Sequence, residues 1–169
     1  MSKLQGALNG IIREITEEDV EAICQIEQEC FPADEAATPA QIKYRFKEAR
    51  ELFLVYEIDG QIVAFIGGLR SDSTVVTSQC MHVHSPNGQT LCIHSVCVKT
   101  QYRRKGIAFK LLTHYVTTYV KQNISGLSII TLICRDYLIP FYEKAGFKCI
   151  GLSSVVHGKL PWHECQIIL

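Results

Sequence analysis

The sequence has 169 residues, of which 47% are hydrophobic and 20% are charged. This length is typical of one domain, and the composition excludes a disordered or collagen-like chain. Lys and Arg together number 17 and Asp and Glu together number 17, so the formal net charge is zero. Because a protein that binds a long polyanion usually carries a basic excess, nucleic acid is not an expected partner.

Two features argue against membrane insertion and secretion. The longest mainly apolar stretch, residues 127–134, is too short to span a bilayer. The N-terminal residues MSKLQGALNG lack the basic, apolar and small-residue regions of a secretory signal. We therefore expect a soluble, cytoplasmic protein with no membrane partner. No repeat or linker divides the chain, so we expect one domain over residues 1–169, acting as a monomer.

In chain order, the first predicted elements are a strand and two helices. A short strand at residues 11–12 precedes Thr16, which is a suitable N-cap because acidic residues follow it. Apolar residues then recur at helical spacing over residues 20–30, interrupted by Glu27. A second helix begins at Thr38-Pro39, with proline at its first helical position.

Four strands joined by two tight turns are predicted in the middle of the chain. The dipeptide Asp59-Gly60 is typical of a hairpin turn, and Pro86-Asn87-Gly88 marks another turn. The strands around these turns are residues 52–58, residues 61–69, a segment ending near His84, and residues 90–98.

The last part of the chain alternates helices and strands. Helical spacing predicts an amphipathic helix over residues 107–122, and the apolar run 127–134 predicts a buried strand. A short helix over residues 137–144 and two strands, residues 147–156 and 163–169, complete the chain. This order predicts a mixed sheet with helices on its faces, in an α/β or α+β domain.

The eight cysteines do not indicate a metal site or a disulfide framework. None forms a C-x-x-C pair, and most lie in apolar runs, where a thiol packs as a small hydrophobe. Cys80, His82 and His84 lie close together in the sequence, but no fourth ligand follows at a standard spacing. We therefore expect no metal.

A basic, glycine-containing motif lies between the strand at 90–98 and the helix at 107–122. It reads Arg103-Arg104-Lys105-Gly106-Ile107-Ala108, and its small residues would let a ligand approach the backbone. The first amides of a helix lack intrahelical partners, and the helix dipole and basic side chains add positive charge. The motif therefore predicts an anion site suited to a pyrophosphate, with an ordinary basic turn as the alternative.

This motif and further segments resemble the GCN5-related N-acetyltransferase superfamily, in particular its arylalkylamine (serotonin) N-acetyltransferase branch. The resemblance implies a mixed, mostly antiparallel central sheet flanked by helices, with acetyl-CoA as co-substrate and no metal. The Cys-Phe-Pro sequence near Phe31 also fits this branch. The other matching segments are residues 94–98, 103–108, 134–142, 145–147 and 156–162.

The resemblance also implies where acetyl-CoA binds. In that family the strand before the motif splays from its neighbour, and the pantetheine arm occupies the open edge. In this sequence the edge is Val96, Cys97 and Val98, and their backbone groups would polarise the thioester carbonyl. Helix-start amides from Arg104 to Phe109 would hold the pyrophosphate, with Tyr142 close to the sulfur.

Two side chains match the catalytic residues of the family. His94 would relay a proton from the amine through water, and Tyr142 would protonate the leaving thiolate. Packing in the core is the alternative for both. Vertebrate enzymes have a histidine where this chain has Cys92, which raises the alternative of a Cys–His acyl-enzyme pair. Residues two apart on a strand lie roughly 7 Å apart, too far for direct activation of the thiol.

The segment 31–37 is the candidate acceptor loop. Phe31 and Pro32 could hold a flat apolar group, and Asp34 and Glu35 could attract an ammonium, although solvated acids in a connecting loop are an equal alternative. Matching to the family places Phe31 together with Ile133 and Trp162 around the acceptor.

These observations predict an acetyl-CoA-dependent N-acetyltransferase that acts on the primary amine of a small molecule by direct attack in a ternary complex. Arylalkylamines such as serotonin or tryptamine are the first candidates for the acceptor, and polyamines the second. The alternatives are a protein N-terminal or lysine acetyltransferase and a non-catalytic acyl-CoA sensor. The presence of both His94 and Tyr142 argues against a sensor.

Overall fold

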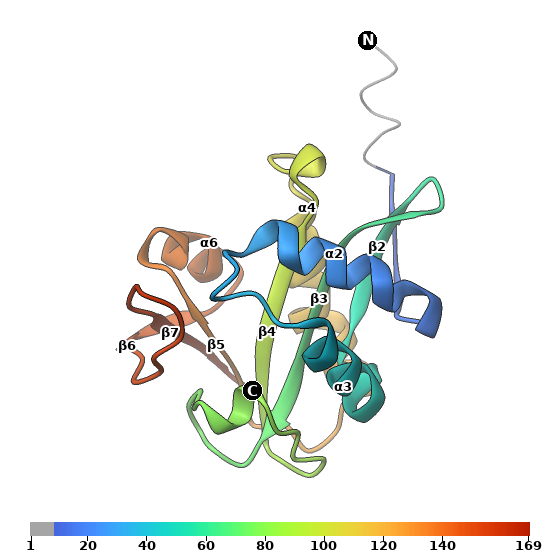
Figure 1. The fold of residues 1–169 in the computed structure, drawn as a ribbon. Helices are drawn as coiled ribbons and strands as arrows, with labels where there is room; N and C mark the ends of the chain where they lie inside the picture. Colours follow the sequence, from blue (N-terminus) through green and yellow to red (C-terminus); the bar gives the residue numbers. More distant parts are fainter. Residues whose placement is uncertain (1–8) are drawn as a thin grey trace.

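A computed structural model describes residues 9–169, in which seven strands form one sheet with helices on both faces (Figure 1). Most of the N-terminal segment assessed above for a secretory signal lies outside these residues. In chain order, with η for short 3₁₀ and π segments, the elements are β1 (Ile11–Glu14), η1 (Glu17–Asp19), α2 (Val20–Cys30), α3 (Pro39–Ala49), η2 (Arg50–Leu52), β2 (Leu54–Ile58), β3 (Gln61–Ser71), η3 (Gln79–Met81), β4 (Thr90–Val98), η4 (Thr100–Tyr102), α4 (Ile107–His114), η5 (Tyr115–Tyr119), α5 (Val120–Asn123), β5 (Ile129–Cys134), η6 (Asp136–Leu138), α6 (Ile139–Lys144), β6 (Lys148–Leu152) and β7 (His163–Ile168).

The sheet order is β1-β2-β3-β4-β5-β7-β6, and every neighbouring pair is antiparallel except β4 and β5. This confirms the expected mixed, mostly antiparallel sheet. In Figure 1, α2 and α3 lie in front of the sheet and α4 lies behind it. Within residues 9–169, no helix combines the length and the apolar character that crossing a bilayer requires.

The parallel pair β4 and β5 is joined over only a short distance. Residues 90–92 pair with residues 129–131, and no pairing continues beyond them. Figure 1 shows the two strands close together at their lower ends and diverging towards α6 and the start of α4. The divergence leaves the β5-facing edge of residues 93–98 without a strand partner, as the family resemblance implies.

The predicted helix over residues 107–122 is present as α4, η5 and α5 in succession. Its apolar stripe, which includes Ile107, Leu111 and Leu112, is buried against the back of the sheet. The π segment in its middle is anchored by Tyr115, whose hydroxyl donates to the Leu52 carbonyl at 2.7 Å. This long helix fixes the position of the basic motif at its N-terminal end.

The start of the first helical segment is held by a capping box and an ion pair. Thr16 and Asp19 form the capping box, and the Asp19 carboxylate also accepts from Arg13 at 2.7 and 3.0 Å. Both helix starts predicted from sequence are confirmed, since Thr38 likewise forms a capping box with Pro39 in the first turn of α3.

We expect Asp19→Asn to lower the free energy of unfolding at pH 7 by about 1–3 kcal/mol, because a buried charge-assisted hydrogen bond is lost. The Arg13 guanidinium lowers the pKa of Asp19, so its contribution is complete above the unfolded pKa of about 3.9 and is lost as pH falls below it. Urea titrations at several pH values measure both effects. Glu57→Gln is the control, since Glu57 meets Arg13 only at 3.5 Å and is more exposed. An equal loss in both variants would contradict the assignment.

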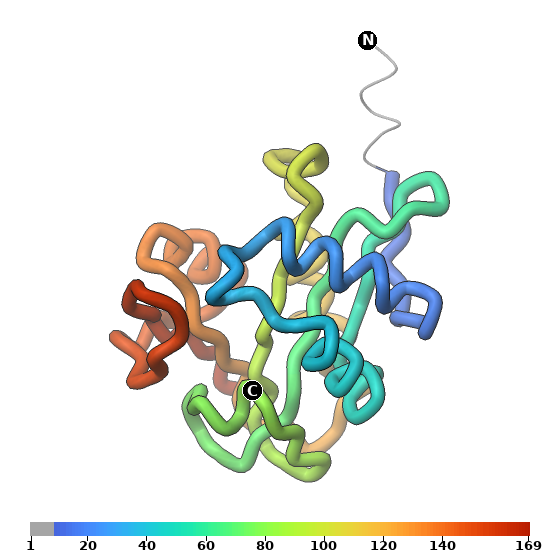
Figure 2. Tube along the Cα trace, in the orientation of Figure 1, coloured from blue at the N-terminus to red at the C-terminus, as the bar shows by residue number. Residues whose placement is uncertain are grey.

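The prediction of a strand that ends near His84 is wrong. Residues 72–89 form a loop that contains only η3 and lies at the lower end of the sheet (Figure 2). The side chains of Ser71 and Ser73 accept hydrogen bonds from backbone amides two residues on, which favours turns over a strand. His84 instead folds back onto β3, where its Nδ1 accepts from the amide of Arg70.

Candidate functional site

A cavity of about 880 Å³ lies where β4 and β5 diverge, a volume ordinary for a small-molecule site. Its wall is built from the loop after α2, from β4, the start of α4, the end of β5, α6 and the loop before β7. Most side chains predicted for the site line it, and Asp34, Cys97 and Lys105 do not. The predicted residues in the wall are Phe31, Pro32, Glu35, His94, Val96, Val98, Arg103, Arg104, Gly106, Ile107, Ala108, Phe109, Ile133, Tyr142 and Trp162.

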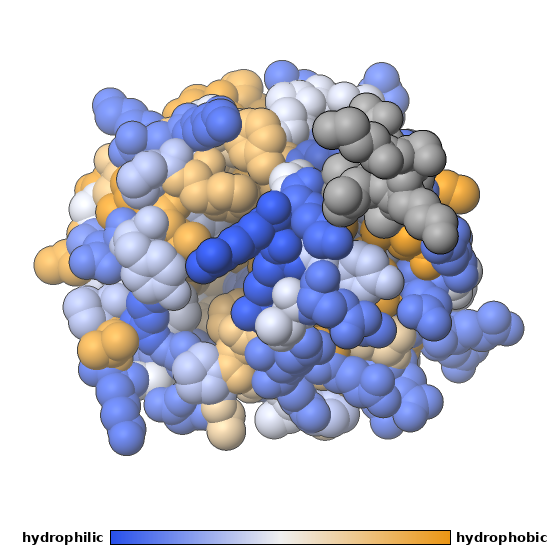
Figure 3. Space-filling model, turned by 90° about the horizontal axis from the view of Figure 1, so that it is seen from above, coloured by the Kyte–Doolittle hydropathy of each residue, from blue (hydrophilic) through white to orange (hydrophobic). Residues whose placement is uncertain are grey.

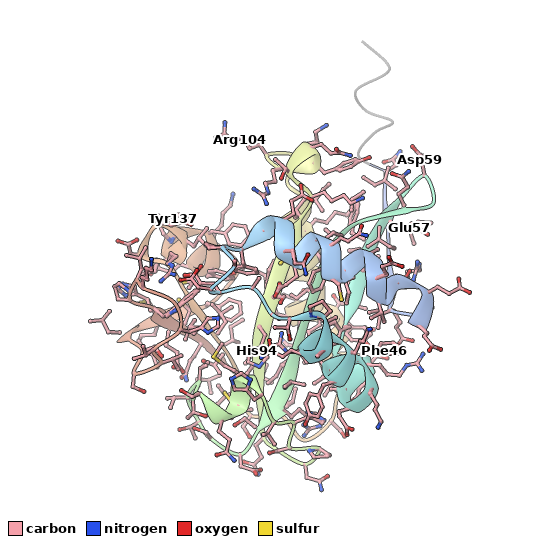
Figure 4. All side chains as sticks on the ribbon, viewed as in Figure 1. Phe46, Glu57, Asp59, His94, Arg104 and Tyr137 are labelled. Atoms are coloured by element: carbon pink, nitrogen blue, oxygen red, sulfur yellow. The ribbon has the colours of Figure 1, made fainter. Side chains whose placement is uncertain are left out.

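One end of the cavity is formed by the start of α4. The first intrahelical bond runs from the Lys110 amide to the Gly106 carbonyl at 3.0 Å, so the amides of residues 107–109 have no intrahelical partner. Gly106 has φ 79°, and a Cβ there would meet no atom within 4 Å, so the backbone is open to a ligand. Arg104, at φ 60°, projects at the top of the molecule (Figure 4). Viewed from above, strongly hydrophilic side chains lie beside an apolar patch on this face (Figure 3). The geometry suits an elongated anion with an apolar arm.

The open edge of β4 exposes the backbone of alternate residues. The Lys99 amide donates to Val63 of β3, while the Val98 carbonyl on the other side accepts from Arg103 Nε at 3.1 Å and from the Cys30 thiol at 3.3 Å. Because backbone direction alternates along a strand, Val96 and Val98 both face the open edge. The backbone N–H and C=O of Cys97 point to β3 instead. Its thiol lies 3.5 Å from a carboxylate oxygen of Glu27, in a buried cluster.

A β-bulge in β4 sets the position of His94. Ser95 pairs with Gly67 and Ile93 pairs with Gly68, so His94 is the extra residue. A Cβ on Gly68 would come within 2.0 Å of the Cys92 carbonyl oxygen, so only glycine allows β4 to lie this close. Figure 4 shows His94 in the lower half of the molecule, well below Arg104.

His94 is held as a neutral imidazole. Its Nε2 lies 3.0 Å from the Cys80 carbonyl oxygen. A carbonyl only accepts hydrogen bonds, so Nε2 carries the proton and the neutral ring presents Nδ1 as an acceptor. Burial and the charge of Arg45 hold the pKa of His94 well below its usual range. The imidazole is therefore neutral at neutral pH.

Tyr142 carries its phenol into the same cavity from α6. Its ring packs edge-on against Phe141 and Phe147, with centroids 5.1 and 5.7 Å away. Burial raises the pKa of Tyr142 well above its usual value, so the phenol stays protonated. Within residues 9–169 its hydroxyl has no hydrogen-bond partner, so the proton is available to a ligand.

The Cys92 thiol forms no hydrogen bond with His94. Its thiol is fully buried, outside the cavity wall, and lies 3.5 Å from the Cys80 sulfur. The hydrogen bond to Cys80 and burial raise the pKa of Cys92 far above its usual value. The arrangement gives neither an exposed thiolate nor a base to activate it. In the described part of the chain, no group of three metal-binding side chains comes together.

The acceptor loop is fastened to the loop before β7. Glu35 forms an ion pair with Arg135, and its backbone carbonyl lies 2.7 Å from His157 Nε2. The Arg135 guanidinium also lies 3.8 Å from the centroid of the Trp162 ring. The cavity is thus lined by Phe31, Pro32, Ile133 and Trp162, whereas Asp34 is exposed to solvent and Glu35 is neutralised by its partner.

Two buried charged residues in the cavity wall were missed by the sequence reasoning. Glu27, on α2, accepts from the Ser95 hydroxyl at 2.8 Å, and burial raises its pKa. Arg45, on α3, is only 5% exposed and donates from Nη2 to the Met81 carbonyl at 3.2 Å. Each interrupts the apolar face of its helix, which is the signal that could have identified them.

Comparisons with known proteins agree with this geometry. Residues 20–147 match the model of the Acetyltransferase (GNAT) family. The serotonin N-acetyltransferase of Mesocricetus auratus is 31% identical over 158 residues, which cover 92% of this chain and 75% of that protein.

Solved structures share the fold. The loading GNATL domain of CurA from Lyngbya majuscula superposes with a TM-score of 0.84 at 17% identity, covering 95% of this chain and 98% of that one. The structure of yncA from Salmonella typhimurium, solved with acetyl-CoA, gives a TM-score of 0.67 at 19% identity, covering 95% of this chain and 94% of that one. The family match, the serotonin N-acetyltransferase relatives and the fold agree: this chain belongs to the GNAT acetyltransferase family and is an N-acetyltransferase.

Proposed function

We propose that the enzyme transfers an acetyl group from acetyl-CoA to the primary amine of a small molecule, by direct attack in a ternary complex. The observation that carries this proposal is the single cavity that joins the free amides of α4 to Tyr142, His94 and the acceptor loop. Both reactants could lie in it together, which direct transfer requires.

Acetyl-CoA, when bound, supplies an acetyl group activated as a thioester. The amides at the start of α4, with Arg103 and Arg104, bind its pyrophosphate. The backbone of Val96 and the amide of Val98 bind the pantetheine arm at the open edge, and their N–H groups stabilise negative charge on the thioester carbonyl oxygen. Tyr142 donates its phenolic proton to the leaving sulfur.

His94 provides the base. Its Nδ1 takes a proton from the amine, through a water molecule, while Nε2–H stays on the Cys80 carbonyl. The burial of Cys92 outside the cavity favours direct transfer over an acyl-enzyme.

For the acceptor, the apolar wall formed by Phe31, Ile133 and Trp162 favours an arylalkylamine over a polyamine. The relatives named serotonin N-acetyltransferase support the same class. An aromatic acceptor would bury its ring against these side chains, whereas a polyamine would place further ammonium groups against them.

The test is an acceptor panel with acetyl-CoA, in which tryptamine, spermidine and a lysine peptide are compared by kcat/KM. The expected result is the highest value for the arylalkylamine class. A lysine peptide as the best acceptor would overturn the proposal, and spermidine as the best would replace arylalkylamines by polyamines.

We expect Gly106→Val to weaken CoA binding strongly. The valine side chain would enter the open space at the start of α4, where the pyrophosphate is expected to bind. The left-handed φ of residue 106 is also unfavourable for a β-branched residue and would lower the stability of the folded protein by about 1–2 kcal/mol. Calorimetry with CoA measures the affinity. Gly60→Val is the matched control, because Gly60 has φ 77° and open space but lies in the hairpin between β2 and β3. Unchanged CoA affinity in a folded Gly106→Val variant would contradict the assignment of the pyrophosphate site.

A further inference from the structure

The Arg45 guanidinium is a buried cation with unused donors in the cavity wall. Its Nη2 donates to the Met81 carbonyl, and among the side-chain nitrogens and oxygens of residues 9–169 that have no exposed surface, Nε alone lacks a hydrogen-bond partner. Burial lowers the pKa of Arg45, but an arginine still carries its charge at neutral pH. Leaving such a group unmatched is costly, so its position calls for a partner from outside the chain.

No carboxylate of the described residues forms an ion pair with Arg45. Glu35 is already paired with Arg135. Glu27 interacts with Arg45 through space, but its oxygens accept hydrogen bonds from Ser95 and none from Arg45. The cavity wall therefore holds a guanidinium that has no carboxylate bonded directly to it among the described residues.

Arg45 lies beside the base. Its Nη2 is bonded to the carbonyl of Met81, and His94 Nε2 is bonded to the carbonyl of the preceding residue, Cys80. Both side chains are therefore bonded to the same short segment, and the charge of Arg45 reaches His94 through space, where it lowers the pKa of the imidazole. An anionic group bound to Arg45 would be only a few bonds from an amine at His94.

We propose that Arg45 binds the α-carboxylate of the acceptor, so that the enzyme acetylates apolar or aromatic α-amino acids in preference to the corresponding simple amines. This proposal rests on the proposed small-amine activity and specifies its substrate class. A carboxylate matches the planar donor pattern of a guanidinium, and in an α-amino acid it is separated from the amine by one carbon. The apolar wall of Phe31, Ile133 and Trp162 would then hold the side chain.

The test compares L-tryptophan with tryptamine, which differ only by the carboxylate. For the natural enzyme we expect a higher kcat/KM for tryptophan. In Arg45→Met, which keeps a similar volume, we expect the tryptophan-to-tryptamine ratio to fall by about 10–100-fold, as loss of a hydrogen bond to a charged group implies. Arg50→Met is the control, because Arg50 is exposed and lies outside this cavity.

A binding measurement makes the result independent of turnover. With CoA present, tryptophan should raise the melting temperature of the natural enzyme more than tryptamine does, and Arg45→Met should lose this difference while keeping a native near-UV CD spectrum. Should Arg45→Met not fold, the ratio and the melting shifts of the natural enzyme still decide the question.

A preference for tryptamine in the natural enzyme would overturn this inference and leave the proposed function intact. Activity on neither compound, with a lysine peptide acetylated instead, would overturn the proposed function itself. Arg45→Met could instead change the preference between acetyl-CoA and malonyl-CoA and leave the tryptophan-to-tryptamine ratio of kcat/KM unchanged. Arg45 would then bind the acyl group, and the proposal would be wrong.

Discussion

Tyr142→Phe is expected to lower turnover by about 10²–10⁴-fold, the usual contribution of a positioned proton donor, while CoA binds with nearly unchanged affinity. The hydroxyl group is the only part removed, and the contacts of the ring with Phe141 and Phe147 remain. Because burial keeps Tyr142 protonated, the deficit should stay constant across neutral and mildly alkaline pH. Steady-state rates over a pH series, with calorimetry for CoA, measure the two parts of this prediction.

Tyr137→Phe is the matched control. Tyr137 lies in the same cavity wall but is 75% exposed, so its phenol should matter little (Figure 4). Turnover of Tyr142→Phe at the level of the natural enzyme would mean that Tyr142 only packs between its aromatic neighbours.

Local patterns predicted the parts of the site that depend on neighbouring residues in the chain. The helix starts at Thr16 and Thr38-Pro39 follow from capping preferences, and both are present. The motif at residues 103–108 lies between β4 and α4, as its glycine and basic residues indicate. These features need only short-range hydrogen bonds, which sequence spacing describes well.

Alternation predicts the faces of β4 only as far as His94, because it assumes a regular strand, and it places Cys92 and His94 correctly on one face. Counting in steps of two from Cys92 places His94, Val96 and Val98 on one face. The bulge at His94 shifts the count, so Val96 and Val98 pack towards the large core behind the sheet while Cys92 and His94 both contact Cys80. A bulge depends on the partner strand and is not visible in β4 alone.

Contacts between distant segments were also beyond sequence reasoning. Glu35 and Arg135 are separated by 100 positions, and their ion pair turns a loop that looked acidic into a neutral wall. Arg45 and His94 are both bonded to η3, which offers them the carbonyls of adjacent residues. Such pairings depend on tertiary packing, which periodicity within one segment does not encode.

His94→Gln is expected to depress the rate most at neutral and lower pH, by about 10²–10⁴-fold. There the acceptor is almost entirely ammonium and needs a base, and the lowered pKa of His94 keeps its Nδ1 unprotonated. As pH rises towards the pKa of the amine, free base arrives without help and the deficit should shrink. Rates with a fixed acceptor across this pH range measure the trend, which is the opposite of the constant deficit expected for Tyr142→Phe.

Cys92→Ala is the comparison that separates the two mechanisms. The thiol is buried away from the cavity against Cys80, so this variant should keep most of its activity, and no acetyl group should accumulate on the protein. Mass spectrometry after mixing with acetyl-CoA alone tests for the acetylated thiol. An acetylated Cys92 together with an inactive Cys92→Ala variant would overturn direct transfer. A deficit of His94→Gln that did not change with pH would instead assign His94 a structural role, because only a proton acceptor is relieved when the amine loses its proton unaided.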